Sequence, residues 1–468
     1  RQMCIRDSRG GVQIDDLNGT PQGATIDMRG FGPNAGSNTL ILIDGRRLNN
    51  SGDRAAPDLA SIDLRRVERV EIVQGSAGTL YGNQAVGGLI NIITRTPRDS
   101  EATIQGGVGS FDNRSLNAHL GHHFDNGLAV SLSARKEEAD NYRDNNRTEL
   151  QDLNLRLDYV HTQGRLFIER QSLDDEQQLP GALFEDELTA DRRQSASAYD
   201  GDFSETDTDL TRIGLEQEFS AYWRLEAEAT HRRNDREFQT SFRTFPGSLA
   251  TQERTVKGLN PRIIGLIPLP NGEASLTAGF DLERTDYLLE TSFGLQELDQ
   301  SVDAHYLQFT APITKVLSTT VGWRQAKVDN RIDTGSGEDR LDDEVSAGSF
   351  GITARPDAGL RLFIRVDENY RFATVDEHTN VVFGQPVGIK NQTGLSHEAG
   401  VEWQRDGLSA KAVIYRLDLE DEISFDTTGF INTNLDETRR EGVILEGRWQ
   451  ASNELTLSGS FTSVSYTH

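Results

Sequence analysis

The sequence predicts a membrane all-β protein in which a barrel follows a small α/β domain. Three observations predict this fold. After Glu101 the apolar residues recur with a period of two, as they do in half-buried strands. Short turns and long polar connections alternate along the same part of the chain. Before Pro97, glycine-containing turns separate apolar runs, which is typical of a compact mixed sheet.

The composition excludes several classes of protein. The chain has 468 residues, with 74 Asp and Glu against 48 Lys and Arg and a formal net charge of −26. No run approaches the roughly 18 apolar residues of a membrane helix, so a helical membrane protein is excluded. The negative balance argues against a nucleic-acid partner. A single cysteine excludes a disulfide framework and a multi-cysteine zinc site.

The two ends of the chain are related at the level of DNA. Residues 3–7 read Met-Cys-Ile-Arg-Asp and residues 464–468 read Val-Ser-Tyr-Thr-His. Complementary DNA strands can encode these two peptides, and the pair resembles a sequencing adapter translated in opposite directions. We therefore expect residues 1–8 and 464–468 to be foreign, and the natural protein to lack Cys4 and to continue past both ends.

The first part of the chain is expected to form a domain over residues 9–97. Two β-rich stretches lie within it, Asn38–Leu48 and Val67–Thr96. Asp44 and Gly45 stand between apolar runs and predict a tight turn there.

The barrel is expected over residues 101–463. In Trp223–Arg232, apolar Leu225 and Ala227 alternate with Glu226 and Glu228. We count about 17 such segments, many near the 9–11 residues that a tilted transmembrane strand needs. Charged residues at alternate positions would be costly in a dry core but are stable beside a hydrated lumen.

The connections between these segments are sorted by length. The short turns include residues 125–127, 161–164, 220–222, 270–273, 356–359, 406–407 and 452–454. The long polar loops are expected near residues 138–150, 172–207, 236–255, 289–302, 329–345, 371–395 and 418–439. Strict alternation places all short turns at one end of a meander, which is typical of outer-membrane barrels. A soluble all-β protein has no reason to sort its loops this way.

Four blocks before Pro97 resemble the plug domain of TonB-dependent outer-membrane receptors. They are residues 26–32, 40–49, 67–75 and 80–94, and the motif residues within them are Arg29, Gly30, Asp44, Gly45, Glu68, Arg69, Glu71, Gly75, Tyr81, Gly82, Gly87, Gly88 and Asn91. Residues 369–377 and 441–447 add weaker matches in the barrel. One departure concerns Gln74-Gly75-Ser76, where the family usually has Arg-Gly-Pro. A buried charge contact of the plug is therefore expected to be missing or replaced by an amide.

The resemblance implies a barrel of about 22 strands with the α/β plug inside its lumen. About five strands and the N-terminal TonB box would then be missing from this chain. The implied function is TonB-dependent uptake of a ferric siderophore across the bacterial outer membrane, driven by the TonB–ExbB–ExbD complex. The implied protein is a lipid-embedded monomer and not an enzyme. It has no resident cofactor or metal, because iron enters only as part of the transported chelate.

The resemblance also places two plug loops at the external cavity, residues 32–38 and 49–58. Amide, hydroxyl and guanidinium groups there suit a polar chelate, and the candidate ligand contacts are Asn34, Ser37, Asn38, Asn49, Asn50, Ser51 and Arg54. Turn chemistry alone also favours Asn and Ser at such positions. On the long loops, Arg143, Tyr199 and Arg243 could grip a ligand by stacking and paired hydrogen bonds. We interpret Tyr142 as a membrane-interface anchor.

Other candidate sites are weaker. The loop at 172–207 has 11 Asp and Glu against two Arg, which indicates a solvated surface more than a calcium site. His119 and His123 share one strand face and His122 lies on the other, so they do not predict a three-ligand metal site. Haem capture by His378 or His397 stays open. Residues 75–82 lack the Gly-Lys-Ser/Thr ending of a phosphate loop.

Alternative functions also stay open. The plug motifs serve cobalamin or saccharide uptake as well as siderophore uptake. An outer-membrane barrel enzyme and a passive porin both predict no plug, and the four blocks argue against them.

Overall fold

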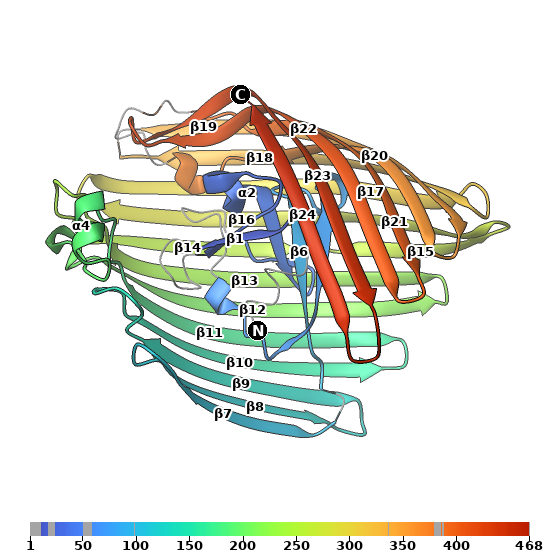
Figure 1. Ribbon diagram of the computed structural model, residues 1–468, viewed down its shortest axis with the longest axis horizontal. Coiled ribbons are helices and arrows are strands. Elements are labelled where there is room, and N and C mark those ends of the chain that lie inside the picture. Colours follow the sequence, from blue (N-terminus) through green and yellow to red (C-terminus); the bar gives the residue numbers. More distant parts are fainter. Residues whose placement is uncertain are drawn as a thin grey trace.

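In the computed structural model, a large curved sheet wraps around a smaller domain (Figure 1). The structure describes residues 11–16, 24–49, 59–97, 99–335, 337–378, 385 and 388–467. We call the described residues before Arg98 the inner domain and the strands after it the wall. Within these ranges, no helix has the length and apolar character needed to cross a membrane.

The inner domain is a mixed α/β unit, as the sequence predicts. A hairpin of β1 (Gln13–Asp16) and β2 (Ala24–Asp27) precedes η2 (Gly32–Asn34) and α2 (Ala35–Asn38). Four strands then form a sheet in the order β4-β3-β6-β5, with β3 at Thr39–Ile43, β4 at Arg46–Arg47, β5 at Val67–Gln74 and β6 at Gly88–Thr94. Between them lie η3 (Leu59–Ser61) and α3 (Gly78–Tyr81).

The predicted turn at Asp44-Gly45 is confirmed. It joins β3 to β4 through two residues that both have positive φ, 50° and 81°. Aspartate tolerates this conformation and glycine adopts it freely, which makes the pair a favoured hairpin loop. Ile41 and Ile90 face one core of this sheet, and Leu40 and Leu89 face the other. The turn therefore fixes where the sheet ends and where Asp44 projects.

The wall is a meander of antiparallel strands, each paired with the next in sequence except β14 and β15. The strands are β7 Glu101–Val108, β8 Arg114–His123, β9 Leu128–Ala139, β10 Thr148–His161, β11 Gly164–Gln178, β12 Phe203–Ser220, β13 Trp223–Gln239, β14 Ala250–Leu259, β15 Arg262–Leu269, β16 Gly272–Thr291, β17 Gly294–Pro312, β18 Leu317–Asp333, β19 Glu338–Asp357, β20 Leu360–Arg371, β21 Gln392–Arg405, β22 Leu408–Asp426, β23 Ile431–Gln450 and β24 Thr456–Thr467. Val464–Thr467, predicted to be foreign, continue β24.

The predicted alternation of the wall is confirmed. On β10, Leu155 is 42% exposed on the outer face, whereas neighbouring Arg156 is 2% exposed and faces the inner domain. Apolar side chains therefore point outward and charged ones point into the lumen, as in barrels that meet lipid on one face.

β14 and β15 occupy one position in the wall. Both pair with β13 on one side and β16 on the other, in unbroken register. Pro261 lies between them and has no backbone N–H to donate, so the ladder lapses there. The eighteen described strands β7–β24 thus fill seventeen positions, which agrees with the segments expected from the sequence.

The two end strands of the wall differ from the rest. β7 and β24 follow one another in the barrel order. Because the number of antiparallel positions is odd, β7 and β24 run in the same direction. Among the described residues, residue-by-residue pairing extends from β7 through the wall to β24. Every residue of both strands is exposed. β24 nevertheless contacts the inner domain, because the hydroxyl of Thr462 accepts from the N–H of Gly11 at 2.7 Å.

Three predicted long loops are wrong. Residues 289–302 and 418–439 are hairpins formed by β16–β17 and β22–β23, and the described residues 329–333 and 338–345 pair as β18 and β19. At these hairpin ends the exposed face is polar and the buried face carries apolar residues such as Leu298, Ile332 and Ile423, so the apolar-outward alternation stops while the backbone continues to pair. The other long connections are shorter than predicted, and the one between β11 and β12 carries α4 (Glu185–Ala190) and η4 (Ser197–Tyr199).

Candidate functional site

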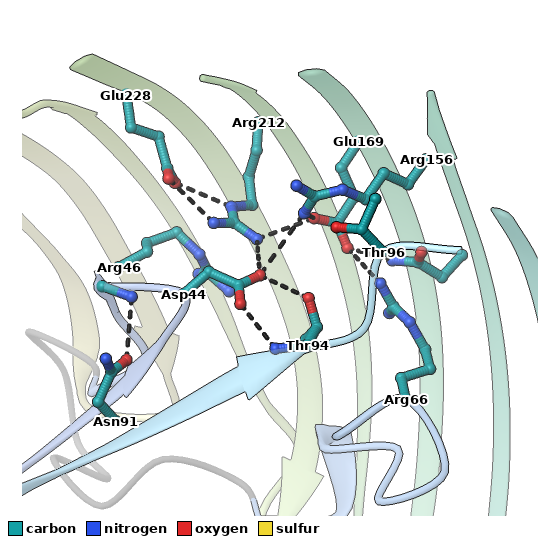
Figure 2. A network of polar contacts seen from close by, with 12 residues as sticks. Asp44, Arg46, Arg66, Asn91, Thr94, Thr96, Arg156, Glu169, Arg212 and Glu228 are labelled. Carbon is teal, nitrogen blue, oxygen red and sulfur yellow. Dashed lines mark hydrogen bonds and ion pairs between the residues drawn. The ribbon is translucent and has the colours of Figure 1, made fainter. Parts of the chain in front are cut away.

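Asp44 connects the inner domain to the wall (Figure 2). Its carboxylate accepts hydrogen bonds from the backbone N–H and the hydroxyl of Thr94, both at 2.7 Å. It also lies 3.4 Å from Arg212 and 3.5 Å from Arg156. Burial alone would raise the pKa of Asp44, but Arg212, Thr94 and Arg156 together hold that pKa below its ordinary value. Asp44 is therefore ionised at neutral pH.

Glu169 of β11 gathers the cations around Asp44. It lies 2.8 Å from Arg66 of the inner domain, 2.8 Å from Arg212 and 3.3 Å from Arg156. Arg212 also pairs with Glu228 on β13 at 2.8 Å. The inner domain is thus held on this side by interlocked ion pairs in which every charge has an opposite neighbour. Removing one member of such a buried network leaves an uncompensated charge.

Arg29 makes the second ionic contact with the wall. It pairs with Glu398 of β21, and it donates to Ser396 at 3.0 Å. Burial and the neighbouring Arg365 lower the pKa of Arg29 to about 9, which still leaves it charged at neutral pH. Gly75, with φ of 90°, lies against this contact, and a Cβ there would collide with Glu398, Arg29 and Arg365. The absence of a side chain at Gly75 therefore leaves the space that the Arg29–Glu398 ion pair occupies.

Gln74 takes the place where the resembled family has arginine. Its amide donates to Glu446 of β23 at 3.0 Å and accepts from Lys411 of β22. Lys411 and Glu446 face each other in the strand register. The contact with the wall is therefore made by an amide that bridges an opposite pair of charges already present on the wall.

Most of the remaining motif residues stabilise the inner domain itself, whereas Gly30 and Gly82 lie against Val464 and Arg324 of the wall. Asn91 accepts from the N–H of Gly45 at 3.0 Å and donates to Glu71 at 3.2 Å. Arg69 pairs with Glu71 at 2.8 Å, and Glu68 is exposed beside them. Within the inner domain, Gly87 and Gly88 lie against Met28. The carbonyl oxygen of Tyr81 accepts a hydrogen bond from Arg47.

The loop after β2 is shaped by Asp27. Its carboxylate accepts from the backbone N–H groups of Gly30, Phe31 and Gly32 at 2.9–3.1 Å. This turn leads into η2 and α2, which carry Asn34, Ser37 and Asn38. Asn34 donates to Glu422 of β22 at 3.4 Å, close to the end of that strand that turns into β23.

The candidate ligand residues of the inner domain fall into two groups. Asn34 and Ser37 are half-buried at the surface of this loop. Asn38 is fully buried and bonds to Asn34 and Gln392. Asn49 is 1% exposed, and its amide joins Ile41, Gly36 and Thr39. Asn34 and Ser37 therefore lie on an accessible face of the inner domain, whereas the buried Asn38 and Asn49 stabilise the backbone beneath it by hydrogen bonds. Asn50, Ser51 and Arg54 lie outside the described residues.

The candidate residues of the outer loops form a separate cluster. Arg143 donates to the carbonyl groups of Pro180, Gly181 and Gln194, and so ties one loop to another. Arg243 pairs with Glu187 and lies 5.8 Å from the ring of Tyr199. Tyr142 is exposed and contacts Phe111 edge-on. Nearby, the ring centroid of Phe242 lies 5.2 Å from that of Phe430, which is in the turn between β22 and β23. Loops from distant parts of the wall thus touch one another.

The histidines are dispersed. His119 bonds to Ser133 and Glu101, whereas His122 bonds to Ser100. Among the described residues, no three His, Cys, Asp or Glu side chains could together hold a metal ion. Burial lowers the pKa of His378 to about 4, so it is neutral, and His397 is exposed on β21.

Sequence reasoning missed the wall residues that receive the inner domain. Arg156, Glu169 and Arg212 are each under 5% exposed, yet they stand in strands among many other charged residues. The alternation of the strands predicts that these side chains point into the lumen. It does not predict which of the many inward-pointing charges contacts Asp44.

Two family models match the chain. Residues 161–468 match the TonB dependent receptor-like beta-barrel, and residues 6–89 match the TonB-dependent Receptor Plug Domain. Among curated proteins, the chain is similar to the Vitamin B12 transporter BtuB of Vibrio vulnificus (strain CMCP6), 29% identical over 158 residues that cover 34% of this chain and 24% of that protein. The corresponding protein of Vibrio cholerae serotype O1 (strain M66-2) is 33% identical over 160 residues, covering 32% and 26%. These alignments span about a quarter of either relative.

Solved structures share the fold over nearly the whole chain. The ferric citrate transporter FecA in the unliganded form has a TM-score of 0.82 at 18% identity, covering 99% of this chain and 75% of that one. The siderophore receptor PiuA from Acinetobacter baumannii has a TM-score of 0.78 at 14% identity, covering 99% and 76%. The copper transporter OprC has a TM-score of 0.77 at 15% identity, covering 98% and 75%. At these identities the likeness shows the fold alone.

Proposed function

The chain belongs to the family of TonB-dependent receptors, which are outer-membrane β-barrel transporters and not enzymes, and from this premise we propose that it imports a ferric siderophore. The inner domain corresponds to the family's plug, and we use that name from here on. The proposed protein works as a lipid-embedded monomer, carries out no covalent chemistry and holds no resident cofactor. Iron belongs to the cargo.

The observation that carries this proposal is the accessible face of the plug. Asn34 and Ser37 present an amide and a hydroxyl there, and the outer loops carry Tyr199 and Arg243. Such groups bind the oxygen-rich surface of a ferric chelate by hydrogen bonds and stacking. FecA and PiuA, whose fold this chain shares, are described as a ferric citrate transporter and a siderophore receptor.

Transport requires that the plug leave its closed position. Its contacts with the wall at Asp44, Arg29 and Gln74 are polar, so water can replace each of them as the plug moves. We propose that TonB, energised with ExbB and ExbD, supplies the work. Cargo bound to the accessible face is released inward because the energised state binds it less tightly than the closed state.

Cobalamin is the second candidate cargo. The curated relatives are described as vitamin B12 transporters, and their alignments cover about a third of this chain. Plug motifs are common to receptors of different cargo, so this likeness supports the transport machine more than the ligand. A porin or a barrel enzyme would have no need of a domain that fills the lumen.

Ligand binding by the chain folded in detergent tests the proposal. Ferric catecholate, hydroxamate and carboxylate chelates and cyanocobalamin are titrated separately while tryptophan fluorescence is followed. Saturable binding of one ferric chelate, weakened about tenfold or more in Asn34→Ala, is expected. Binding of cyanocobalamin alone would replace the siderophore assignment with the cobalamin one, and binding of none would refute both.

A further inference from the structure

A cavity of about 190 Å³ lies between the plug and the wall. Arg46 and Tyr81 of the plug line one side of it, and Arg232 of β13 and Arg262 of β15 line the other. A water molecule occupies about 30 Å³ in the liquid, so the cavity has room for a small polyatomic ion and several waters.

Most of the charges around this cavity are paired. Glu216 lies 2.5 Å from Arg165, Glu226 lies 2.6 Å from Arg262, and Asp281 lies 2.5 Å from Arg324. Asp44 and Glu228 both pair with Arg212. These carboxylates are therefore neutralised by partners other than Arg46 and Arg232.

Six arginines and six carboxylates line the cavity, Glu283 among them, so the lining as a whole is balanced, but Arg46 and Arg232 lie together among further cations. Neither makes an ion pair within the part of the chain that the structure describes. The cations that act on Arg232 are Arg46, Arg254 and Arg47, against a single carboxylate, Glu283. The two terminal nitrogens of Arg232 donate to the carbonyl oxygens of Leu48 and Asn49, which satisfy hydrogen bonds but carry no charge.

The same guanidinium groups retain unused donors. The Nε atoms of Arg46, Arg232 and Arg254, and Nη1 of Arg254, are buried without an acceptor among the described residues. Arg232 is 8% exposed and Arg254 is 5% exposed. A buried cationic donor without an acceptor is unfavourable, and an anion in the adjoining cavity would satisfy both its hydrogen bond and its charge.

We propose that Arg46 and Arg232, with Arg254 behind them, bind a small oxyanion in this cavity. Guanidinium groups favour oxyanions because their planar donors match the oxygens of carboxylate and phosphate. One arginine belongs to the plug and two belong to the wall, so the bound anion bridges the two bodies. The oxyanion is either free inorganic phosphate or a carboxylate group of a transported molecule, and the site exists whatever the main cargo is.

Inorganic phosphate is the probe that tests this site. It is titrated into the full chain in a maltoside detergent at constant ionic strength, and binding is followed by ³¹P line broadening. Arg46→Gln removes one cavity cation that makes no described ion pair. Arg233→Gln is the matched control, because Arg233 is the next residue to Arg232 but is exposed and pairs with Asp235. Arg254→Gln is a second test variant, since the described contacts of Arg254 include no hydrogen bond to the plug.

Saturable binding to the unmodified chain is expected, with about tenfold or greater weakening in Arg46→Gln and Arg254→Gln and none in Arg233→Gln. Phosphate should also raise the thermal unfolding midpoint of the unmodified chain and of Arg233→Gln, but not of Arg46→Gln. Absence of saturable binding, or equal weakening in all three variants, would overturn the proposal. Competition by citrate separates the sources: displacement of phosphate shows that carboxylates enter the site, and no displacement identifies inorganic phosphate as the ligand.

Discussion

The carboxylate of Asp44 lies 3.4 Å from the guanidinium of Arg212, although 168 residues separate the two in the sequence. Asp44 occupies a two-residue turn of the plug, and Arg212 lies on a strand of the wall. A local turn of the plug thus determines which part of the wall can hold it. This relationship sets the first two predictions.

Asp44→Asn should loosen the plug. The substitution leaves Arg212 and Arg156 with their wall carboxylates but removes the charge contributed by the plug. We expect a loss of roughly 3 kcal/mol, at the low end for a broken buried ion pair because the wall partners stay in place. The measurement is urea unfolding in detergent, together with the rate of proteolysis of the plug.

Asp406→Asn is the matched control for this change. Asp406 occupies the same kind of turn, with φ of 50° followed by a glycine with φ of 79°, but it is exposed at the end of the wall. It should change stability by less than about 0.5 kcal/mol. An equal effect of both substitutions would show that turn geometry, not the contact with Arg212, causes the loss.

The Asp44 contact should also depend on pH. The pKa of Asp44 is lowered in the folded protein, so its contribution is fully present above the unfolded value of about 3.9 and is lost as the pH falls through the folded value. The stability difference between the unmodified chain and Asp44→Asn should be constant from pH 7 to about 5 and should shrink below about 4. A difference that declines between pH 7 and 5 would contradict the lowered pKa.

Gln74 and Lys411 should be coupled in a double-mutant cycle. Gln74→Arg gains a charge opposite Glu446 but places it beside Lys411, so the single substitution should be neutral or destabilising. In a Lys411→Met background the same change should stabilise the protein, with a coupling free energy of about 1–2 kcal/mol. Urea unfolding of the four proteins measures it. Additive effects would mean that Gln74 does not bridge the two wall residues.

Asn34 and Asn49 should separate binding from stability. Asn49→Ala removes hydrogen bonds to three buried backbone groups, which should cost about 2–4 kcal/mol of unfolding free energy. Asn34→Ala should leave stability within about 0.5 kcal/mol and weaken binding of the cargo. The same two variants are compared by unfolding and by ligand titration. The reverse pattern would remove Asn34 from the binding face.

Much of the wall could be predicted from sequence because its signal is local. Alternation of apolar and charged residues, as at Leu155 and Arg156, follows from one face meeting lipid and the other meeting the lumen. The hairpins at 289–302 and 418–439 escaped the same reasoning, because their exposed face is polar and their apolar residues, such as Leu298 and Ile423, lie on the buried face. The predicted number of strand positions, seventeen, still agrees with the structure, because these hairpins lengthen strands and do not add new ones.

The contacts of the plug could not be predicted in the same way. Asn38 and Asn49 have the composition of exposed turns, yet both are buried, because their amides satisfy backbone groups that the sheet leaves unpaired. Arg212 and Glu169 are two of many inward charges, and only the position of the plug selects them. These choices depend on residues far apart in the sequence.

The lapse between β14 and β15 has a consequence for the backbone pairing of the wall. Pro261 accepts a hydrogen bond from Phe280 but cannot return one, and Gly258, Asn260 and Arg262 around it line the luminal cavity. Along this line the wall lacks one donor beside the luminal cavity, while Asn260 still donates to Glu228 and β13 and β16 continue unbroken past it.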